Sequence, residues 1–286
     1  MSFASPASIP LIEANGLSIP AIGLGTMNLE GDVCIDAVQH AIKCGYRHID
    51  TARRYSNEKE CGVAIRASGI ARSDLFVTTK VLHGTEWDNP AVNTVLPAIE
   101  DSLKRLQMNY VDLLLIHWPH PTTPIKDTMA DLVAAKRKGY ARHIGISNFT
   151  MAMVDEAVKH AAEPLSNHQC EYHPYLDQSK LRAKTFGYGL SWTSYCPLGR
   201  AVVFDDPVIQ KIAATHHKTA AQILLRWQFQ QGKTITIPKS SNHTRLEENI
   251  AIFNFDLSES EMQQISSLHK PDGRMITPPF SPKWDQ

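Results

Sequence analysis

The sequence has no excess of charge of either sign. Its 286 residues include 29 basic and 29 acidic side chains, so the formal net charge at pH 7 is zero. A protein that binds nucleic acid usually needs a basic excess to displace the counterions of the phosphate backbone, so no nucleic-acid partner is expected. Because 43% of the residues are hydrophobic, the composition also differs from that of a disordered chain.

Long apolar runs and an N-terminal targeting pattern are also missing. No stretch of about 18 uncharged apolar residues occurs, so neither a transmembrane helix nor a membrane partner is expected. The first basic residue is Lys43, which leaves no positively charged segment for a secretory signal. We therefore expect a cytoplasmic protein, and we take it to be a monomer.

Cysteine and histidine do not form the usual metal or disulfide patterns. The five cysteines are odd in number and no two have CxxC spacing, so neither a disulfide framework nor a structural zinc site is expected. A metal hydrolase needs convergent histidine and carboxylate ligands, and neither His117 with His120 nor His216 with His217 has zinc-like spacing. We therefore expect no bound metal.

Strand-sized apolar segments alternate with helical patterns along the whole chain. Many of these segments are nearly all apolar or β-branched, which is typical of parallel strands covered on both faces. The expected strands are Pro20–Gly25, Tyr46–Asp50, Leu75–Lys80, Tyr110–His117, His143–Ser147, Asn167–Glu171, Ser191–Tyr195 and Thr234–Pro238. Eight strands and about eight helices predict an α/β fold, a (β/α)8 TIM barrel in a single domain over residues 1–286. An open doubly wound sheet has the same periodicity and remains the alternative.

Two further elements are expected at the ends of the barrel. Ile12 and Leu17 flank Asn15-Gly16, which predicts an N-terminal β-hairpin. Residues 258–269 predict a short C-terminal helix, and a tail with several prolines follows it.

Three local signals predict where helices begin. Pro90 precedes an apolar stripe with helical spacing, which predicts a proline in the first helical position. Asn57 with Glu60 and Ser258 with Glu261 have the spacing of capping boxes.

Polar residues interrupt the strand segments near their carboxyl ends. They are Asp50, Lys80, His117, Ser147, Asn148, Gln169, Tyr195 and Lys239. A single polar residue at a strand end usually meets only solvent. In a barrel, however, all the carboxyl ends converge on the face where active sites are built, so the set as a whole predicts a functional site.

Three of these segments could together form a tuned acid. Tyr55 follows five residues after Asp50, and the ordinary pKa of tyrosine, near 10, makes it a poor acid at neutral pH. An ammonium group beside it would lower that pKa, and Lys80 could supply one. Asp50 would hold the lysine in place, and His117 would orient a carbonyl group nearby. The alternative for Asp50 and Lys80 is an ordinary buried ion pair.

The sequence resembles the aldo-keto reductase family, and in particular bacterial members similar to 2,5-diketo-D-gluconate and methylglyoxal reductases. The resemblance covers nearly the whole chain in order and includes Lys80. The matching segments are Gly45-Tyr-Arg-His-Ile-Asp-Thr-Ala52, Tyr55-Ser-Asn-Glu58, Leu115-Ile-His-Trp-Pro119, Gly145-Ile-Ser-Asn-Phe149, Glu171-Tyr-His-Pro-Tyr175, Ser194-Tyr-Cys-Pro-Leu198 and Ile237-Pro-Lys-Ser240.

The resemblance implies a barrel that binds NADPH and reduces a small-molecule carbonyl substrate, with Tyr55 as general acid. Asp50 and Lys80 would tune it, and His117 would orient the carbonyl. Residues implied to bind the cofactor are Gly25, Thr26 and Met27 beside the nicotinamide ribose, Ser147, Asn148 and Gln169 at the carboxamide, Tyr195 against the ring, Pro197 and Leu198 along the pyrophosphate, Lys239, Ser240 and Arg245 at the 2′-phosphate, and Glu248 and Asn249 near the adenine.

The substrate pocket is less well defined by the sequence. Met27, Trp87 and Trp118 are candidates for its walls, although aromatic residues also dominate protein cores. The short tail suggests small, polar substrates such as dicarbonyls and keto-sugar acids. Arg53-Arg54 departs from the usual family pattern, either facing solvent or favouring anionic substrates, and Cys196 replaces a common serine.

Other functions have less support in the sequence. Gly23-Leu-Gly25 could begin a Rossmann fingerprint, but the third glycine is replaced by Asn28. A non-catalytic or regulatory protein that keeps the barrel and its cofactor is the remaining alternative.

Overall fold

The computed structural model describes residues 9–83 and 94–285. It begins with the expected hairpin, in which β1 (Leu11–Ala14) pairs antiparallel with β2 (Leu17–Pro20). Asn15 and Gly16 connect the two strands with φ angles of 45° and 79°. Asn-Gly tolerates this left-handed backbone well, which is why the dipeptide predicts a hairpin turn.

Eight parallel strands form a closed barrel in the sequential order β3 to β10. Ile22, just before β3, bridges Thr236 in β10, so the first and last strands meet. The bounds are β3 Leu24–Gly25, β4 His48–Asp50, β5 Phe76–Val81, β6 Val111–Ile116, β7 Ala141–Ser147, β8 Leu165–Glu171, β9 Ser191–Tyr195 and β10 Thr234–Thr236. The predicted barrel is confirmed, and the open doubly wound sheet is wrong.

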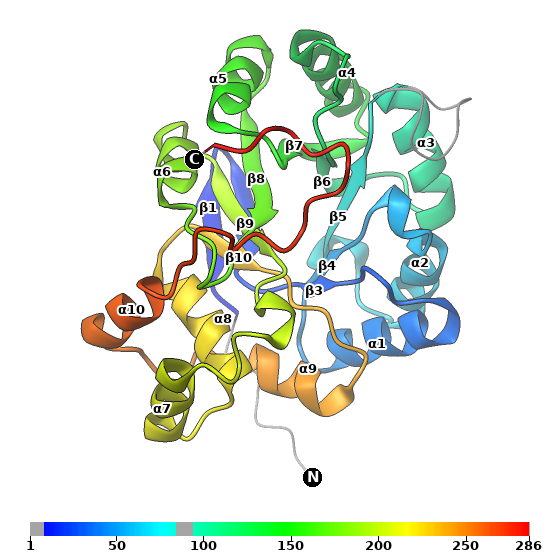
Figure 1. Cartoon of the computed structure of the whole chain (residues 1–286). Coiled ribbons are helices and arrows are strands. Elements are labelled where there is room, and N and C mark those ends of the chain that lie inside the picture. Colours follow the sequence, from blue (N-terminus) through cyan, green and yellow to red (C-terminus); the bar gives the residue numbers. More distant parts are fainter. Residues whose placement is uncertain (1–8, 84–93, 286) are drawn as a thin grey trace.

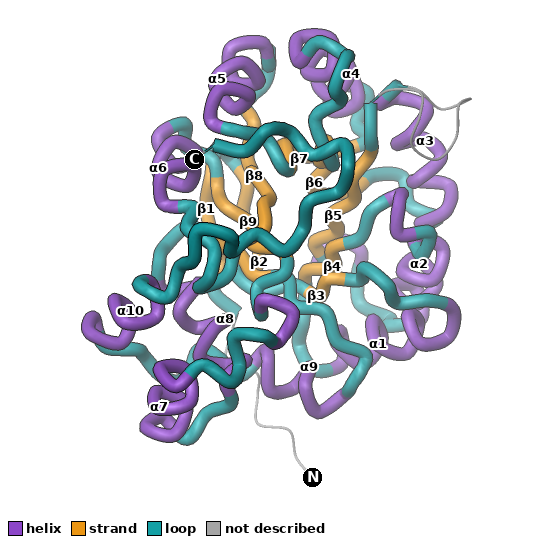
Figure 2. Tube along the Cα trace, in the orientation of Figure 1, coloured by secondary structure: helices purple, strands orange, loops and turns teal. Residues whose placement is uncertain are grey.

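Helices surround the barrel on its outer side (Figures 1 and 2). Within the described residues, α7 and α10 are additional to the barrel helices and contact each other. The bounds are α1 Gly31–Lys43, α2 Glu58–Ala67, α3 Val95–Leu106, α4 Ile125–Arg137, α5 Met151–His160, α6 Ser179–Gly187, α7 Pro207–His216, α8 Ala220–Gln230, α9 His243–Ile250 and α10 Glu259–Ser266. Among the residues described, no helix is long and apolar enough to cross a membrane.

The hairpin packs against the inside of the barrel. Leu17 and Ile19 of β2 belong to one apolar cluster with Phe76, Leu113 and Ile235, which come from three barrel strands. Phe76 and Ile235 lie near the start of their strands, so the hairpin covers the amino end of the barrel. The opposite, carboxyl end therefore remains available for a site.

The capping box before α10 forms as expected. The Ser258 hydroxyl accepts a hydrogen bond from the Glu261 N–H, and the Glu261 carboxylate accepts one from the Ser258 N–H at 2.7 Å. The prediction for Pro90 falls outside the described residues, and α3 is described from Val95 onward.

The capping box predicted at Asn57 and Glu60 is wrong. Asn57 does precede α2, but its side chain makes no cap and turns into the protein. Its amide donates to the carbonyls of Thr26 and Leu29 at 2.7 and 2.9 Å, and its oxygen accepts from the Thr51 hydroxyl at 2.9 Å. Asn57 thus binds the loop after β4 to the loop after β3, because three nearby backbone and hydroxyl groups compete successfully for its side chain.

Candidate active site

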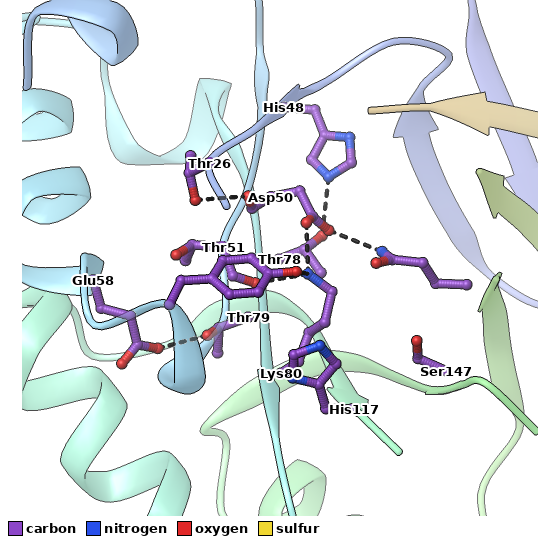
Figure 3. A network of polar contacts seen from close by, with 12 residues as sticks. Thr26, His48, Asp50, Thr51, Glu58, Thr78, Thr79, Lys80, His117 and Ser147 are labelled. Atoms are coloured by element: carbon purple, nitrogen blue, oxygen red, sulfur yellow. Dashed lines mark hydrogen bonds and ion pairs between the residues drawn. The ribbon is translucent and has the colours of Figure 1, made fainter. Parts of the chain in front are cut away.

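A buried ion pair lies at the carboxyl ends of β4 and β5. Lys80 is fully buried, and its Nζ donates to Asp50 Oδ1 at 2.5 Å and to the Thr51 carbonyl at 2.9 Å. The Tyr55 hydroxyl lies 3.4 Å from the same nitrogen. Gln169 donates from Nε2 to the other Asp50 oxygen at 2.9 Å. Figure 3 shows the Lys80 ammonium directed at Asp50. The structure therefore brings together the residues of the predicted acid.

Asp50 and Lys80 are held as a charged pair. Burial raises the pKa of Asp50, while the Lys80 ammonium and the Gln169 amide stabilise its carboxylate. Burial would lower the pKa of Lys80, but attraction to Asp50 and contact with Tyr55 outweigh it and raise that pKa. Lys80 is therefore an ammonium group fixed beneath the tyrosine hydroxyl.

Tyr55 differs from the expectation in its acidity. It ends the 3-10 turn η1 (Arg53–Tyr55), and its ring is half-buried. Burial raises the pKa of Tyr55 above its ordinary value, and the lowering effect of Lys80 is smaller. The prediction of a lowered tyrosine pKa is therefore wrong. The hydroxyl stays protonated at neutral pH, and the role left for the ammonium is to stabilise a phenolate after the proton has left.

His117 stands beside Tyr55 as a neutral imidazole. It directly follows β6, and its ring meets the Tyr55 ring edge-on with centroids 5.6 Å apart. Burial, followed by the positive charges of Lys80 and Arg54, holds the pKa of His117 well below its usual range. Asn148 donates to the His117 carbonyl at 2.9 Å and fixes its backbone. A neutral imidazole can donate one N–H to a carbonyl oxygen without competing with Tyr55 for the proton.

A cavity of about 1510 Å³ opens at this face of the barrel. Lys80 and Ser147 are fully buried and do not line it. Trp87 lies outside the described residues. The predicted residues that line the cavity are Gly25, Thr26, Met27, Asp50, Tyr55, His117, Trp118, Asn148, Gln169, Tyr195, Pro197, Leu198, Lys239, Ser240, Arg245, Glu248 and Asn249.

The middle of the cavity wall is a connected polar strip. Asn148 follows β7 with φ of 64°, which is the left-handed conformation that asparagine tolerates. Its oxygen accepts from the Tyr195 hydroxyl at 2.7 Å, and its amide donates to Ser147 Oγ at 3.0 Å. Gln169 is not part of this chain of bonds, since its amide donates to Asp50. These bonds fix the side chains before any ligand arrives.

One end of the cavity is basic. Lys239 and Arg245 have exposed side chains on its wall. Ser240, which follows Lys239 in the sequence, also lines the cavity but is buried. Ser240 Oγ accepts from the Asn242 N–H at 3.0 Å, and the Asn242 side chain caps α9 by accepting from the Arg245 N–H. A lysine, an arginine and a hydroxyl beside a helix start are suited to a phosphate group.

The C-terminal tail forms a wall that the sequence analysis missed. It crosses the carboxyl face of the barrel (red in Figure 1), and residues 275–278 line the cavity. Glu171, fully buried at the end of β8, accepts hydrogen bonds from the N–H groups of Met275 at 2.6 Å and Ile276 at 3.0 Å. A lone glutamate at the end of a strand gave no sequence signal for a partner more than 100 residues away.

Trp118 lies on the cavity wall and also packs against the C-terminal tail. It lines the cavity and is 5% exposed. Its ring also packs edge-on against Phe280 and Trp284 of the tail, with centroids 5.5 and 6.1 Å away. Met27, by contrast, lines the cavity with 49% of its surface exposed.

The structure also shows where the two departures from the family pattern, Arg53-Arg54 and Cys196, lie. Arg53 pairs with Asp101 at 3.4 Å, whereas Arg54 lines the cavity. Cys196 also lines the cavity and has a φ of 52°. Arg200, a further cavity residue on the turn η3 (Gly199–Ala201), was not singled out from the sequence.

The structure is a (β/α)8 barrel with a large cavity at its carboxyl face. A buried lysine, carboxylate and histidine lie there beside a half-buried tyrosine. This is the layout of a barrel enzyme, because active sites in this fold lie at that face. The chain belongs to the aldo/keto reductase family, whose family model matches residues 21–270. The resemblance proposed from the sequence is thus confirmed.

Individual relatives cover nearly all of the chain. It is 39% identical over 274 residues to methylglyoxal reductase DkgB of Escherichia coli O157:H7, covering 94% of this chain and all of the relative. It is 42% identical over 258 residues to glyoxal reductase of Bacillus subtilis (strain 168), covering 90% and 91%. The crystal structure of Bombyx mori aldo-keto reductase in complex with NADP has a TM-score of 0.85 at 32% identity and covers 96% of each chain. These relatives favour an oxidoreductase over the non-catalytic alternative.

Proposed function

We propose that this protein is a cytoplasmic, monomeric, single-domain reductase that uses NADPH to convert small aldehydes, ketones, dicarbonyls and keto-sugar acids to alcohols. The observation that carries the proposal is the contact of the Lys80 ammonium with both Asp50 and the Tyr55 hydroxyl beside His117. The names of the relatives, methylglyoxal reductase and glyoxal reductase, support small dicarbonyls as substrates.

The four central residues divide the work of carbonyl reduction. A bound reduced nicotinamide supplies the hydride that the carbonyl carbon accepts. His117 donates its N–H to the carbonyl oxygen and orients it, and Tyr55 gives its proton to the same oxygen. Lys80 then stabilises the phenolate at a starting distance of 3.4 Å, and Asp50 holds Lys80 in place.

The cavity has room for the proposed cofactor. At about 1510 Å³ it exceeds the roughly 300–1,000 Å³ of an ordinary small-molecule pocket, as an extended dinucleotide with a substrate requires. The proposed binding groups are Gly25, Thr26 and Met27 at the nicotinamide ribose, Asn148 and Gln169 at the carboxamide with Ser147 bonded to Asn148 behind the wall, Tyr195 against the ring, Pro197 and Leu198 at the pyrophosphate, Lys239, Ser240 and Arg245 at the 2′-phosphate, and Glu248 and Asn249 at the adenine.

The substrate is proposed to lie between the catalytic groups and the tail. Trp118 and Met27 supply apolar contacts there, and Trp87 remains a third candidate for the wall. Arg54 also lines the cavity, and its guanidinium lies over the Phe280 ring at 5.0 Å. A guanidinium at this place favours substrates that carry a carboxylate, such as keto-sugar acids.

The choice of cofactor is tested with Arg245→Ala. Wild-type protein is expected to oxidise NADPH when methylglyoxal is added, and the variant to raise the KM for NADPH about tenfold or more, since a charged hydrogen bond to phosphate contributes about 1.5–3 kcal/mol. The KM for NADH should change less than twofold. The measurement is the loss of reduced-nicotinamide absorbance with each cofactor.

Arg137→Ala is the matched control, because Arg137 is exposed on α4, on the outside of the barrel. It should leave both KM values unchanged. If Arg245→Ala raised the KM values for NADPH and NADH equally, the proposed contact of Arg245 with the 2′-phosphate would be contradicted. If wild-type protein consumed no NADPH with methylglyoxal, glyoxal or a keto-sugar acid, the proposed reductase activity would be wrong and the regulatory alternative would take its place.

A further inference from the structure

Three potential metal ligands converge on the outer surface between α1 and α9. His40 and Cys44 are four residues apart on α1 and at its end, so both side chains lie on the same face. Glu247 faces them from α9. One ligand atom from each of the three side chains lies within 4.8 Å of the other two, and His40 Nε2 is 3.0 Å from Glu247 Oε1.

Neighbouring side chains hold this cluster in position. The His243 ring stacks on the His40 ring with centroids 3.7 Å apart and planes 8° from parallel. His243 is itself bound to Asp36 of α1, with 2.7 Å between Nε2 and the carboxylate. Tyr46 donates to the Leu246 carbonyl at 3.0 Å, which fixes α9 against the segment after α1. The ligands therefore project from two helices whose spacing is already set.

The donor set suits a borderline-soft divalent cation. Imidazole nitrogen, cysteine sulfur and carboxylate oxygen are the usual ligands of zinc, and three of them leave a fourth position for water. Metal–ligand distances of about 2.0–2.3 Å place tetrahedral ligand atoms roughly 3.3–3.8 Å apart, so small rotations of the side chains suffice. The side chain of His40 is 15% exposed and that of Glu247 is 47% exposed, which leaves a path for the ion.

We propose that His40, Cys44 and Glu247 form a zinc-binding site that links α1 to α9. The expectation of no metal rested on the cysteine and histidine spacings in the sequence, which do not show this site because Glu247 is 207 residues from His40. It is separate from the reductase chemistry, since none of its three ligands lines the cavity. Arg245 and Asn249 of the same helix do line it. Zinc would therefore stabilise α9, the helix that carries Arg245, which is proposed to bind the 2′-phosphate.

The site is tested by titrating the full-length protein, freed of metal by a chelator, with Co²⁺ as a spectroscopic substitute for zinc. We expect near-ultraviolet thiolate-to-cobalt absorption together with visible bands of tetrahedral Co²⁺. Cys44→Ser should abolish the thiolate absorption. It should also lower the affinity for zinc at least tenfold, measured in competition with a coloured chelator. Glu247→Gln should also lower the affinity for zinc at least tenfold. Because Glu247 is exposed, that variant keeps the fold.

Cys196→Ser is the matched control for the thiol, since Cys196 is the other partly exposed cysteine. It should retain the cobalt spectrum and the zinc affinity. Zinc should also raise the Tm of wild-type protein and of this control, but not that of Cys44→Ser. Absence of thiolate absorption in the wild type, its survival in Cys44→Ser, or its loss in Cys196→Ser would overturn the proposal.

Discussion

Replacing Tyr55 with phenylalanine is expected to lower kcat for the reduction of methylglyoxal about a thousandfold, within the range of about 10²–10⁴ for loss of a general acid. The phenol is proposed as the proton donor of the site, because Lys80 is tied to Asp50 and His117 is neutral. Phenylalanine keeps the ring against His117 but has no proton to give. Steady-state rates of NADPH oxidation measure the effect.

The same variant should bind NADPH almost as tightly as the wild type, with Kd changed less than twofold in a fluorescence titration. Tyr188→Phe is the matched control, because Tyr188 is 40% exposed and its hydroxyl bonds to Asp155 at 2.6 Å on the surface. It should keep its full rate. Turnover of Tyr55→Phe within tenfold of the wild type would show that another group supplies the proton.

Replacing Lys80 with methionine is expected to remove activity and to destabilise the fold. The change leaves the Asp50 carboxylate buried without its cation, and breaking a buried pair in this way costs about 3–5 kcal/mol. For a protein of this size that lowers Tm by roughly 5–10 °C. Thermal unfolding followed by circular dichroism measures the loss, and the reductase assay should show at least a hundredfold lower kcat.

The double variant Lys80→Met with Asp50→Asn separates stability from chemistry. Asparagine removes the unpaired charge while it can still accept the hydrogen bond from Gln169. The double variant should therefore regain much of the lost stability but none of the activity. A Lys80→Met protein as stable as the wild type, or a double variant less stable than Lys80→Met, would contradict a buried charged pair.

The barrel and most of its site could be predicted because their signals are local. A run of apolar residues that ends in a polar one is visible at each strand, and parallel neighbours then bring the polar ends together. Asp50 and Lys80 meet for this reason, since Asp50 pairs with Thr78 in β5, two residues before Lys80. The roles of these residues in NADPH-dependent reduction remain proposals that the variants above test.

Two predictions, the capping box at Asn57 and the lowered pKa of Tyr55, were wrong. In each case two physical effects compete, and the sequence does not show which is stronger. Asn57 has the spacing of a capping residue, but the backbone carbonyls of Thr26 and Leu29 bind its amide instead. For Tyr55, the sequence predicts an ammonium neighbour, and the neighbour is present. How deeply the hydroxyl is buried depends on the whole fold, however, and that burial determines the direction of the pKa shift.

The remaining features depend on contacts between distant parts of the chain. Glu171 meets Met275 across 104 residues, so neither segment signals the other. The same holds for Glu247 beside His40 and Cys44, where the helical spacing on α1 is visible in the sequence but the third ligand is not. Only the packing of α9 against α1 brings these side chains together.

The most direct test of the proposed function is the transfer of the hydride itself. Protein would be incubated with methylglyoxal and NADPH that carries deuterium at both C4 positions of the nicotinamide, and the product would be analysed by mass spectrometry and NMR. We predict an alcohol with one deuterium on the former carbonyl carbon and none on its oxygen after exchange with water. An alcohol without deuterium on that carbon, or no alcohol at all, would contradict hydride transfer at this site.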